Sequence, residues 1–374
     1  MENPFKFSGI VEAPAFCDRE QELSDLKQYA ESSQNVLLYS HRRYGKSSLL
    51  FKLMRDLKSI QSIYVDLYGT TSPQDFLAAF LTAICSLESK IERLMKLIRN
   101  SLSSISINFG IDPLTGLPTV SPILGRKVDD RTMSELFTLL EHVSKKRKLL
   151  VVFDEFQEVA AYEEASFEKQ LRKSIQTHDT IAYFFAGSQR HLLMDMFNDN
   201  KRAFYQLAAS YPLKKIETGH YVEWANGLFQ AAGKRVDLQT IEAVVTRCHN
   251  HPRYVQQFFH ELWHVEEVNP TIVEQTERQI ITKRVPEFAY IWDSLSLNQK
   301  RALKLLAGTE GKNIFAADKL SRFGFRTASQ VTAALITCEK LGIASKNKSW
   351  SIQDPFFEKW LQLKISGIHQ LYTS

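Results

Sequence analysis

The chain has 374 residues, more than one compact core usually holds, so two or three domains are expected. Hydrophobic residues make up 44% of the sequence and charged residues 24%, which excludes a chain that is disordered as a whole. The net charge of +5 is only mildly basic, so it neither requires nor excludes a nucleic-acid partner.

The sequence also indicates a compartment. No apolar run reaches the roughly 18 residues that a membrane-spanning helix needs, and the first 16 residues lack the basic start and apolar centre of a signal peptide. The four cysteines lie far apart, with neither metal-binding nor disulfide spacing. We therefore expect a cytoplasmic protein with no membrane partner.

The first half of the chain alternates predicted strands with predicted helices. Residues 35–40 form a short apolar run that predicts a buried strand, and residues 46–57 follow with the apolar spacing of a helix. A strand over 62–67 and a helical stretch over 73–99 come next. Helix 131–145, strand 148–153 and strand 180–186 continue the alternation, which predicts an α/β fold with a mostly parallel sheet.

One segment interrupts this alternation. Residues 101–124 alternate apolar and polar residues on both sides of an Asp-Pro-Leu-Thr-Gly-Leu-Pro turn, which predicts an inserted β-hairpin.

The second half of the chain is predicted to be helical. Helices over 237–247, 252–265 and 270–283 indicate an all-helical block. Helices near 297–307, 314–321 and 327–341, followed by two short strands and a last helix, have the order of a winged helix. We therefore divide the chain into a core over 1–217, a helical lid over 218–284 and a winged helix over 285–374.

A candidate phosphate-binding loop lies between the first strand and the first long helix. Its residues are Ser40, His41, Arg42, Arg43, Tyr44, Gly45, Lys46, Ser47 and Ser48. Amide groups at the start of a helix face phosphates, Lys46 can reach the β- and γ-phosphates, and the Ser47 hydroxyl can ligate Mg²⁺. Ser40 stands where this pattern usually has glycine, so we expect a modified loop.

Two further strand ends carry polar residues suited to the same chemistry. The apolar strand over 148–153 ends in Asp154 and Glu155, where the aspartate can hold Mg²⁺ and the glutamate can polarise an attacking water. Ser188, Gln189 and Arg190 follow the strand over 180–186 and are candidates to contact a γ-phosphate, although they also suit a polar helix cap. The carboxyl ends of parallel strands are where α/β sheets bind ligands.

Together these motifs resemble the archaeal-type ATPase family, in the STAND branch of AAA+ P-loop ATPases. The likeness covers nearly the whole chain. It includes Asn3-Pro4-Phe5, the segment Phe16-Cys17-Asp18-Arg19-Glu20-Gln21-Glu22-Leu23, the loop Arg42-Arg43-Tyr44-Gly45-Lys46-Ser47-Ser48-Leu49, the acidic strand end Val152-Phe153-Asp154-Glu155-Phe156-Gln157, the lid motif His251-Pro252-Arg253-Tyr254-Val255-Gln256 and the winged helix up to Leu361.

The resemblance implies that ATP binds between core and lid, with Arg19 and its neighbours close to the adenine and Pro252 on the lid side. Pro252 also suits the first position of a helix. Asn250 replaces the lid motif's glycine. Leu207 stands where the family has an arginine in Ala203-Phe204-Tyr205-Gln206-Leu207-Ala208, so Arg190 and Arg202 are the candidate substitutes.

The sequence predicts an ATPase that binds ATP and Mg²⁺ and acts as a slow molecular switch, with Lys46, Glu155 and Arg190 as catalytic residues. One alternative is a DNA-binding ATPase that uses the winged helix, where Arg322, Arg326, Lys340, Lys346 and Lys348 could contact phosphates. Another is a scaffold that binds nucleotide without hydrolysing it. A protein partner, self-association or internal packing of the winged helix stays open.

Overall fold

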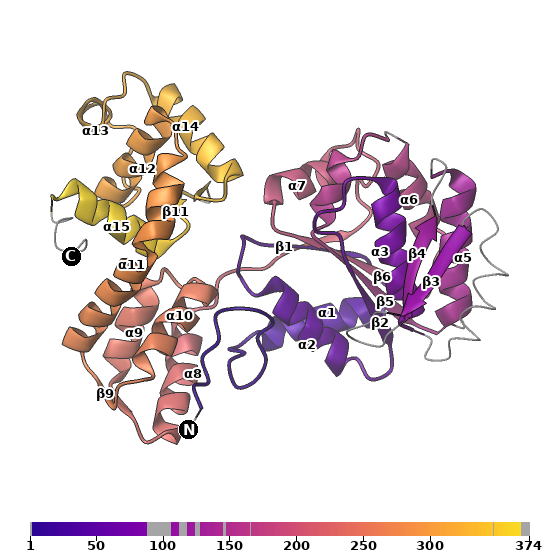
Figure 1. The fold of residues 1–374 in the computed structure, drawn as a ribbon, viewed down its shortest axis with the longest axis horizontal. Coiled ribbons are helices and arrows are strands. Elements are labelled where there is room, and N and C mark those ends of the chain that lie inside the picture. Colours follow the sequence, from indigo (N-terminus) through magenta and orange to yellow (C-terminus); the bar gives the residue numbers. More distant parts are fainter. Residues whose placement is uncertain are drawn as a thin grey trace. The chain divides into compact units, whose positions relative to one another are not determined.

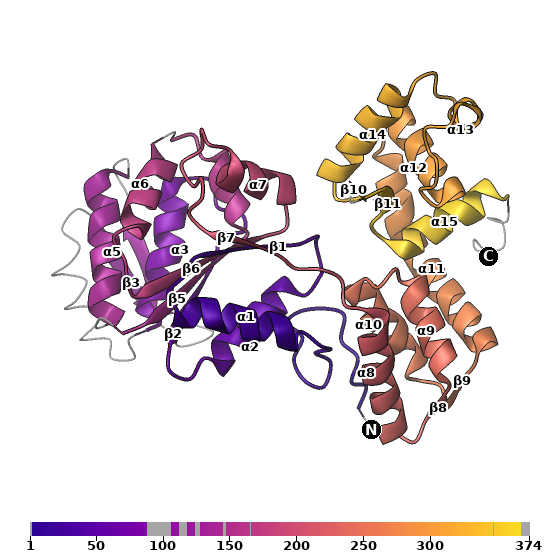
Figure 2. The ribbon, with the colours of Figure 1, turned by 180° about the vertical axis from the view of Figure 1, so that it is seen from behind.

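The computed structural model describes residues 2–87, 106–111, 118–123, 128–144, 147–164, 166–346 and 348–367. These residues form two compact units, one over residues 19–214 and the other over residues 1–18 together with 215–374. Figures 1 and 2 show the two units from opposite sides. The helical prediction for 88–99 lies outside the described residues.

The first unit is an α/β layer structure. Its helices and strands are α1 (Glu20–Glu31), β1 (Val36–Tyr39), α2 (Lys46–Asp56), β2 (Gln61–Asp66), α3 (Pro73–Cys85), β3 (Ser106–Ile111), β4 (Pro118–Ile123), α5 (Asp130–Ser144), β5 (Leu149–Asp154), the 3₁₀ helix η1 (Phe156–Ala161), α6 (Phe167–Ile175), β6 (Ile181–Gly187), α7 (Arg190–Asn198) and β7 (Ala209–Pro212). β3 and β4 pair antiparallel inside the range where the alternating pattern predicts a hairpin.

Five parallel strands form the central sheet, in the order β2-β5-β6-β1-β7. Both faces are covered, with α1 and α2 on one face and α3, α5 and α6 on the other (Figure 1). The middle strands β5 and β6 are buried along their whole length because each contacts helices on both faces, which explains their continuous apolar sequence. The mostly parallel α/β core is confirmed.

The second unit is mainly helical. Its elements are α8 (Thr218–Ala231), β8 (Arg235–Val236), α9 (Leu238–Arg247), α10 (Pro252–Leu262), β9 (Glu267–Val268), α11 (Pro270–Asp293), α12 (Leu297–Thr309), α13 (Ala317–Arg322), α14 (Ala328–Lys340), β10 (Ala344–Lys346), β11 (Trp350–Ile352) and α15 (Pro355–Ile365). Three helices, an antiparallel strand pair and a last helix follow α11, in the predicted order of a winged helix. The helical block also holds the short parallel pair of β8 and β9.

Helix α11 is longer than the sequence indicates. It continues through Pro286 to Asp293, ten residues past the predicted end at 283. Arg284 stands in the middle of this helix, where its guanidinium pairs with Asp354 of the segment before α15 at 2.6 Å and with Glu287 at 2.9 Å. The ring of Phe288 lies 4.6 Å from the same guanidinium. These contacts join α11 to α15.

The first 18 residues, which the sequence analysis assigns to the core, pack within the second unit. The ring of Phe5 is 2% exposed and has four aromatic neighbours, with centroid distances of 5.2 to 5.7 Å to Trp224, Phe229, Phe259 and Trp263. Backbone groups are fixed as well, because the Lys6 N–H donates to Gln256 Oε1 at 3.0 Å. The side chain of Gln256 also donates to the Ala15 carbonyl. The N-terminal motif therefore has a packing role.

We expect Phe5→Ala to lower the free energy of unfolding of the second unit by about 3–5 kcal/mol, because it opens a cavity among four rings. Chemical denaturation of the full chain, followed by tryptophan fluorescence, measures the change. Phe315→Ala, at a side chain that is 46% exposed in the same unit, should change stability by less than about 1 kcal/mol. Equal effects of the two substitutions would contradict this role of Phe5.

Candidate functional site

The candidate site lies at the carboxyl end of the central sheet, where the loop after β1 meets the ends of β5 and β6. Gly45 is the residue before α2 and takes the left-handed conformation, with φ 84°. Gly45 has no side chain that could cap the amides at the start of α2. Amides at the start of a helix point toward the space in front of it, where an anion is favoured.

Ser40 fits its position without backbone strain. The φ angle of Ser40 lies outside the left-handed region. The loop residues that do have left-handed φ angles are Arg43 and Gly45. The Ser40 hydroxyl donates to the His41 carbonyl at 3.0 Å. A side chain at this position is therefore compatible with the modified loop that the sequence predicts.

Lys46, Ser47 and Asp154 converge. The Lys46 ammonium donates to Asp154 Oδ1, and both side chains are buried. The Ser47 hydroxyl donates to Asp154 Oδ2 at 2.8 Å. Burial favours the protonated carboxyl, but the Lys46 charge and the hydrogen bonds to Asp154 outweigh it, so the pKa of Asp154 lies below its ordinary value. Asp154 is therefore a carboxylate at neutral pH.

One partner in this cluster is not apparent from the sequence. Tyr64, on β2, donates its hydroxyl to Asp154 Oδ2. Burial and the neighbouring carboxylate raise the pKa of Tyr64, so the hydroxyl stays protonated and remains a donor. The parallel pairing that sets Tyr64 opposite Val152 explains the contact, whereas the sequence shows only a tyrosine in an apolar strand.

Glu155 is held in a defined position beside this cluster. One of its carboxylate oxygens lies 3.7 Å from the Lys46 ammonium, and the other accepts a hydrogen bond from the Ser188 hydroxyl at 3.0 Å. Gln157 donates its amide to that second oxygen. Glu155 itself is left-handed, with φ 52°, an uncommon conformation for a residue with a side chain. The structure thus brings together five of the predicted site residues, Lys46, Ser47, Asp154, Glu155 and Ser188.

Gly187, at the end of β6, makes room for this arrangement. A Cβ atom at Gly187 would lie 2.1 Å from Oε1 of Gln157, so any side chain there would displace the glutamine that contacts Glu155. In the sequence, Gln157 is only part of a motif and Gly187 does not stand out. Only the packing of β6 against η1 shows what the two residues do.

Two of the candidate arginines, Arg190 and Arg202, contact other protein groups. Arg190, the first residue of α7, donates to Nε2 of His41 at 2.9 Å, which places it against the phosphate-binding loop. Arg202 pairs with Glu168 on α6, away from the loop. Arg42 and Arg43 are exposed.

Tyr44 and Ser48 are buried parts of the same segment. Burial raises the pKa of Tyr44 to about 12, although the charges of Arg190 and Arg19 oppose this. Arg19 itself is buried and donates to Glu22 and, at 2.8 Å, to the Lys214 carbonyl. Gln189, the residue before α7, makes no side-chain cap of that helix.

Pro252 belongs to the other unit and begins α10 there, at the position that suits proline in a helix. The roles of Arg19 and Pro252 in nucleotide binding stay predictions.

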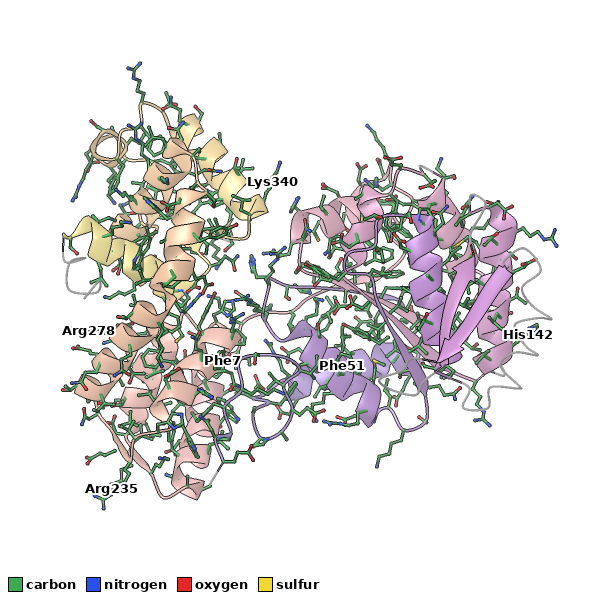
Figure 3. The ribbon with its side chains drawn as sticks, in the orientation of Figure 1. Phe7, Phe51, His142, Arg235, Arg278 and Lys340 are labelled. Carbon is green, nitrogen blue, oxygen red and sulfur yellow. The ribbon has the colours of Figure 1, made fainter. Side chains whose placement is uncertain are left out.

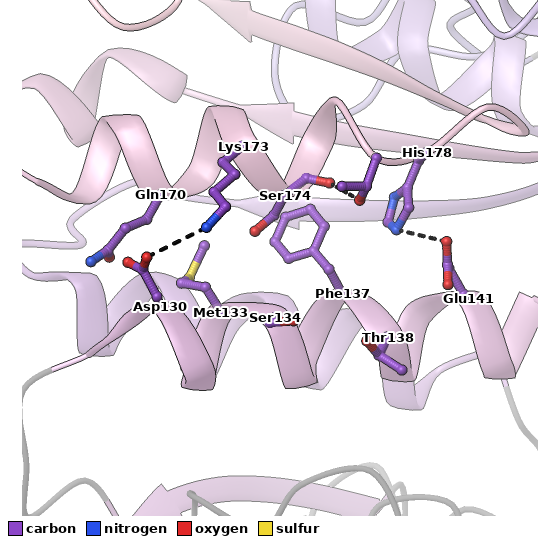
Figure 4. Close-up of a pocket in the computed structure, with 11 residues that line it drawn as sticks. Asp130, Met133, Ser134, Phe137, Thr138, Glu141, Gln170, Lys173, Ser174 and His178 are labelled. Carbon is purple, nitrogen blue, oxygen red and sulfur yellow. Dashed lines mark hydrogen bonds and ion pairs between the residues drawn. The ribbon is translucent and has the colours of Figure 1, made fainter.

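A cavity of about 300 Å³ lies between α5 and α6 (Figure 4). Lys173 pairs with Asp130 across it at 3.7 Å, and His178 faces Glu141 at 3.4 Å. Burial lowers the pKa of His178, which favours the neutral ring. None of the predicted site residues lines this cavity, so we place the candidate site at the loop after β1.

The remaining expectations about composition concern cysteines and membranes. Cys17, Cys85, Cys248 and Cys338 are buried free thiols, as their spacing predicts. Within the described part of the chain, no helix combines the length and apolar character that crossing a membrane requires.

Two families match parts of the sequence. Residues 16–180 match the family described as an ATPase domain predominantly from Archaea, and residues 286–363 match the one described as a probable winged helix domain. The comparison with curated proteins found no match.

Among solved structures, the fold is similar to a Walker-type ATPase of Pyrococcus abyssi, with a TM-score of 0.67 and 19% identity over 96% of this chain and 99% of that chain. It is also similar to the ORC2 protein of Aeropyrum pernix, solved in ADPNP and ADP complexes, with a TM-score of 0.56 and 14% identity over 98% and 97% of the two chains. At these identities the likeness establishes the fold. The AAA+-like core with a C-terminal winged helix is confirmed.

We expect the interaction between Lys46 and Asp154 to make stability depend on pH. Since folding lowers the pKa of Asp154, its contribution is fully present above the unfolded value of about 3.9 and is lost as the pH falls through the lower folded value. At pH 7, Asp154→Asn should cost on the order of 3 kcal/mol, because it leaves a buried ammonium without its main partner. Urea unfolding of both proteins between pH 7 and pH 3 should show the gap shrinking, and a constant gap would contradict the prediction.

Proposed function

Residues 16–180 form an ATPase domain of the family that occurs predominantly in Archaea, and from this premise we propose that the protein is an ATP-driven molecular switch that hydrolyses ATP slowly. The convergence of Lys46, Ser47 and Glu155 on and around Asp154 supports the proposal most strongly. A lysine and a hydroxyl at the start of a helix, beside two carboxylates at the end of a strand, are the groups that phosphoryl-transfer sites of this class use.

The donor set fits a magnesium nucleotide. The amides at the start of α2 and the Lys46 ammonium would bind phosphate oxygens. Ser47 Oγ and Asp154 Oδ2, which are 2.8 Å apart, are oxygen ligands of the type that Mg²⁺ prefers. Bound Mg²⁺ would supply neutralisation of phosphate charge. Lys46 and Ser47 would then exchange part of their bonding to Asp154 for bonding to the ligand.

Glu155 is the group we assign to water activation. Its carboxylate carries two hydrogen bonds on one oxygen, from Ser188 and Gln157, while the other oxygen faces Lys46 at 3.7 Å. Fixing one oxygen orients the carboxylate, so that the other can accept the proton of a water molecule. Ser188 and Arg190 are the residues that we assign to contact with the γ-phosphate.

A slow rate follows from the arginines. Leu207 occupies the position at which the family that this chain resembles has an arginine. Arg202 pairs with Glu168. Arg190 is therefore the better candidate to stabilise transition-state charge, but it must leave His41 to do so. An arginine finger can raise the hydrolysis rate by about 10³–10⁵-fold. Without an arginine already in that position, ATP would stay bound for longer before hydrolysis, which suits a switch.

Further elements of the proposal follow from the family resemblance. Arg19 and Pro252 would lie near the adenine, and residues 218–284 would act as the lid over the nucleotide. ATP and ADP are the ligands, and the protein would work in the cytoplasm with a protein partner or a second copy.

A DNA-binding ATPase is the second candidate. Arg322 and Arg326, before α14, and Lys346 and Lys348, around the turn after β10, are exposed. Lys340 extends from the end of α14 (Figure 3). In a winged helix, side chains at these places can contact phosphates.

Lys46→Ala should weaken ATP binding by about 2–5 kcal/mol, roughly 30-fold or more, because it removes a buried charge contact with phosphate. Glu155→Gln should keep ATP affinity and lower turnover by roughly 10²–10⁴-fold, because the amide cannot accept the proton. Calorimetry with Mg-ATP and a phosphate-release assay measure both effects.

The control is Lys52→Ala on α2, which removes a surface lysine paired with Asp56 and should leave both readouts unchanged. Wild-type affinity in Lys46→Ala would exclude the assigned site. Equal turnover in wild type and Glu155→Gln would favour a scaffold that binds nucleotide without hydrolysing it.

The switch predicts that Mg-ATP changes the spacing between the two units, since a ligand shifts an equilibrium only if it binds one state better. Spin labels at Gln176→Cys and Ser329→Cys report this spacing, because both positions are exposed and the four native cysteines are buried. Double electron–electron resonance should show that Mg-ATP shifts the distance distribution between the labels. In the Lys46→Ala background, Mg-ATP should cause no shift. An unchanged distribution in the labelled wild type would reject the switch.

A further inference from the structure

Three lysines gather around one tryptophan ring in the second unit. Trp292 lies near the end of α11, Lys300 and Lys304 lie on α12, and Lys364 lies on α15. The three ammonium nitrogens are 5.7, 5.6 and 5.5 Å from the centre of the Trp292 ring. We call these four residues the Trp292 face.

The charges of this face are only partly offset by carboxylates. Within the described part of the chain, none of the three lysines forms an ion pair, whereas Lys283 and Lys312 of the same unit lie 2.8 and 2.9 Å from glutamate oxygens. Asp293 is close enough to act on the charge of Lys364, but it makes no ion pair with it. The face therefore keeps a concentrated positive charge.

The lysines also act on one another. Burial lowers the pKa of Lys364, and the charges of Lys304 and Lys300 lower it further, against the opposing effect of Asp293. All three side chains are half-buried, so the positions of their charges are restricted by packing. Contact with an indole face stabilises a cation at an exposed site by only about 0.5–1 kcal/mol. A multiply charged anion would relieve the remaining repulsion better than single ions from solution.

We propose that the Trp292 face binds the phosphate backbone of a nucleic acid. Lys300 and Lys304 stand one helical turn apart on α12, and the exposed Leu297 precedes them on the same stripe. Lys364 adds a charge from a second helix, so the site presents a row of point charges beside aromatic and aliphatic surface. Lysines that neutralise phosphates bind a DNA duplex without reading its sequence.

This face uses none of the residues on α14 and the strand turn that a winged helix would place on DNA. The proposed binding of nucleic acid rests on charge complementarity and does not require ATP binding. The proposal can therefore fail while the proposed switch stands. An acidic protein segment is the competing occupant, and the experiment below separates the two.

The test measures binding of a fluorescein-labelled DNA duplex to the full chain over a range of salt concentrations. In the variant with Lys300→Gln, Lys304→Gln and Lys364→Gln, we expect at least tenfold weaker binding. The slope of log affinity against log salt should become shallower by roughly 2–3, since each phosphate contact contributes about 0.9. The single variant Lys300→Gln, with its smaller risk of misfolding, should make the slope shallower by about 0.9.

Matched controls remove the same charge elsewhere. Lys234→Gln, Lys283→Gln and Lys312→Gln together delete three lysines of the same unit, each bonded to a protein oxygen, and should leave the slope unchanged. Replacing the three face lysines by arginine should retain binding. The proposal is overturned if the glutamine variants bind with the wild-type slope, if the slope changes only in Lys346→Glu with Lys348→Glu, or if polyglutamate binds the face more tightly than DNA.

Discussion

The ion pair between Lys46 and Asp154 is the contact on which the candidate site depends. It joins the first residue of α2 to the end of β5, although β6 lies between β1 and β5 in the sheet. The lysine therefore spans the end of the intervening strand. Gly187 ends that strand and pairs with Tyr39 of β1, and its lack of a side chain leaves room for Gln157. The strand order and one glycine thus determine where the charges meet.

Much of this site could be predicted from the sequence because its signals are local. Hydrophobic patterns and residue types are enough to predict the strand, loop and helix around Lys46. They are also enough to predict the apolar strand that ends in Asp154 and Glu155. Ser40 was the exception in the loop, and only its backbone angle shows that a serine fits there.

The rest depends on contacts between distant parts of the chain. Tyr64 reaches Asp154 because β2 pairs with β5, and no sequence pattern gives that pairing. Strand β7 was not predicted, because its four residues are short, mostly exposed and end in proline. Helix α11 outlasts its predicted end because contacts of Arg284 with Asp354 and Phe288 stabilise its second half.

Residues of the lid motif have packing roles within the second unit. Asn250 donates to the Ile216 carbonyl and to Thr218, and so fixes the chain where the second unit resumes. Tyr254 packs edge-on against Phe356 of α15, and Gln256 bonds to both Lys6 and Ala15. These contacts explain the residues at three positions of the motif, because each residue stabilises the second unit.

The placement of residues 1–18 has a consequence for how the protein is made. The chain starts in the second unit, builds the first unit over residues 19–214 and returns at Lys215. Arg19 and the Lys214 carbonyl are hydrogen-bonded, so the departing and returning segments lie side by side. A ribosome that adds about 5–20 residues per second needs on the order of ten seconds or more to reach the partners of Phe5. During that interval the apolar segment around Phe5 lacks its native neighbours, so it is accessible to a chaperone while the first unit is made.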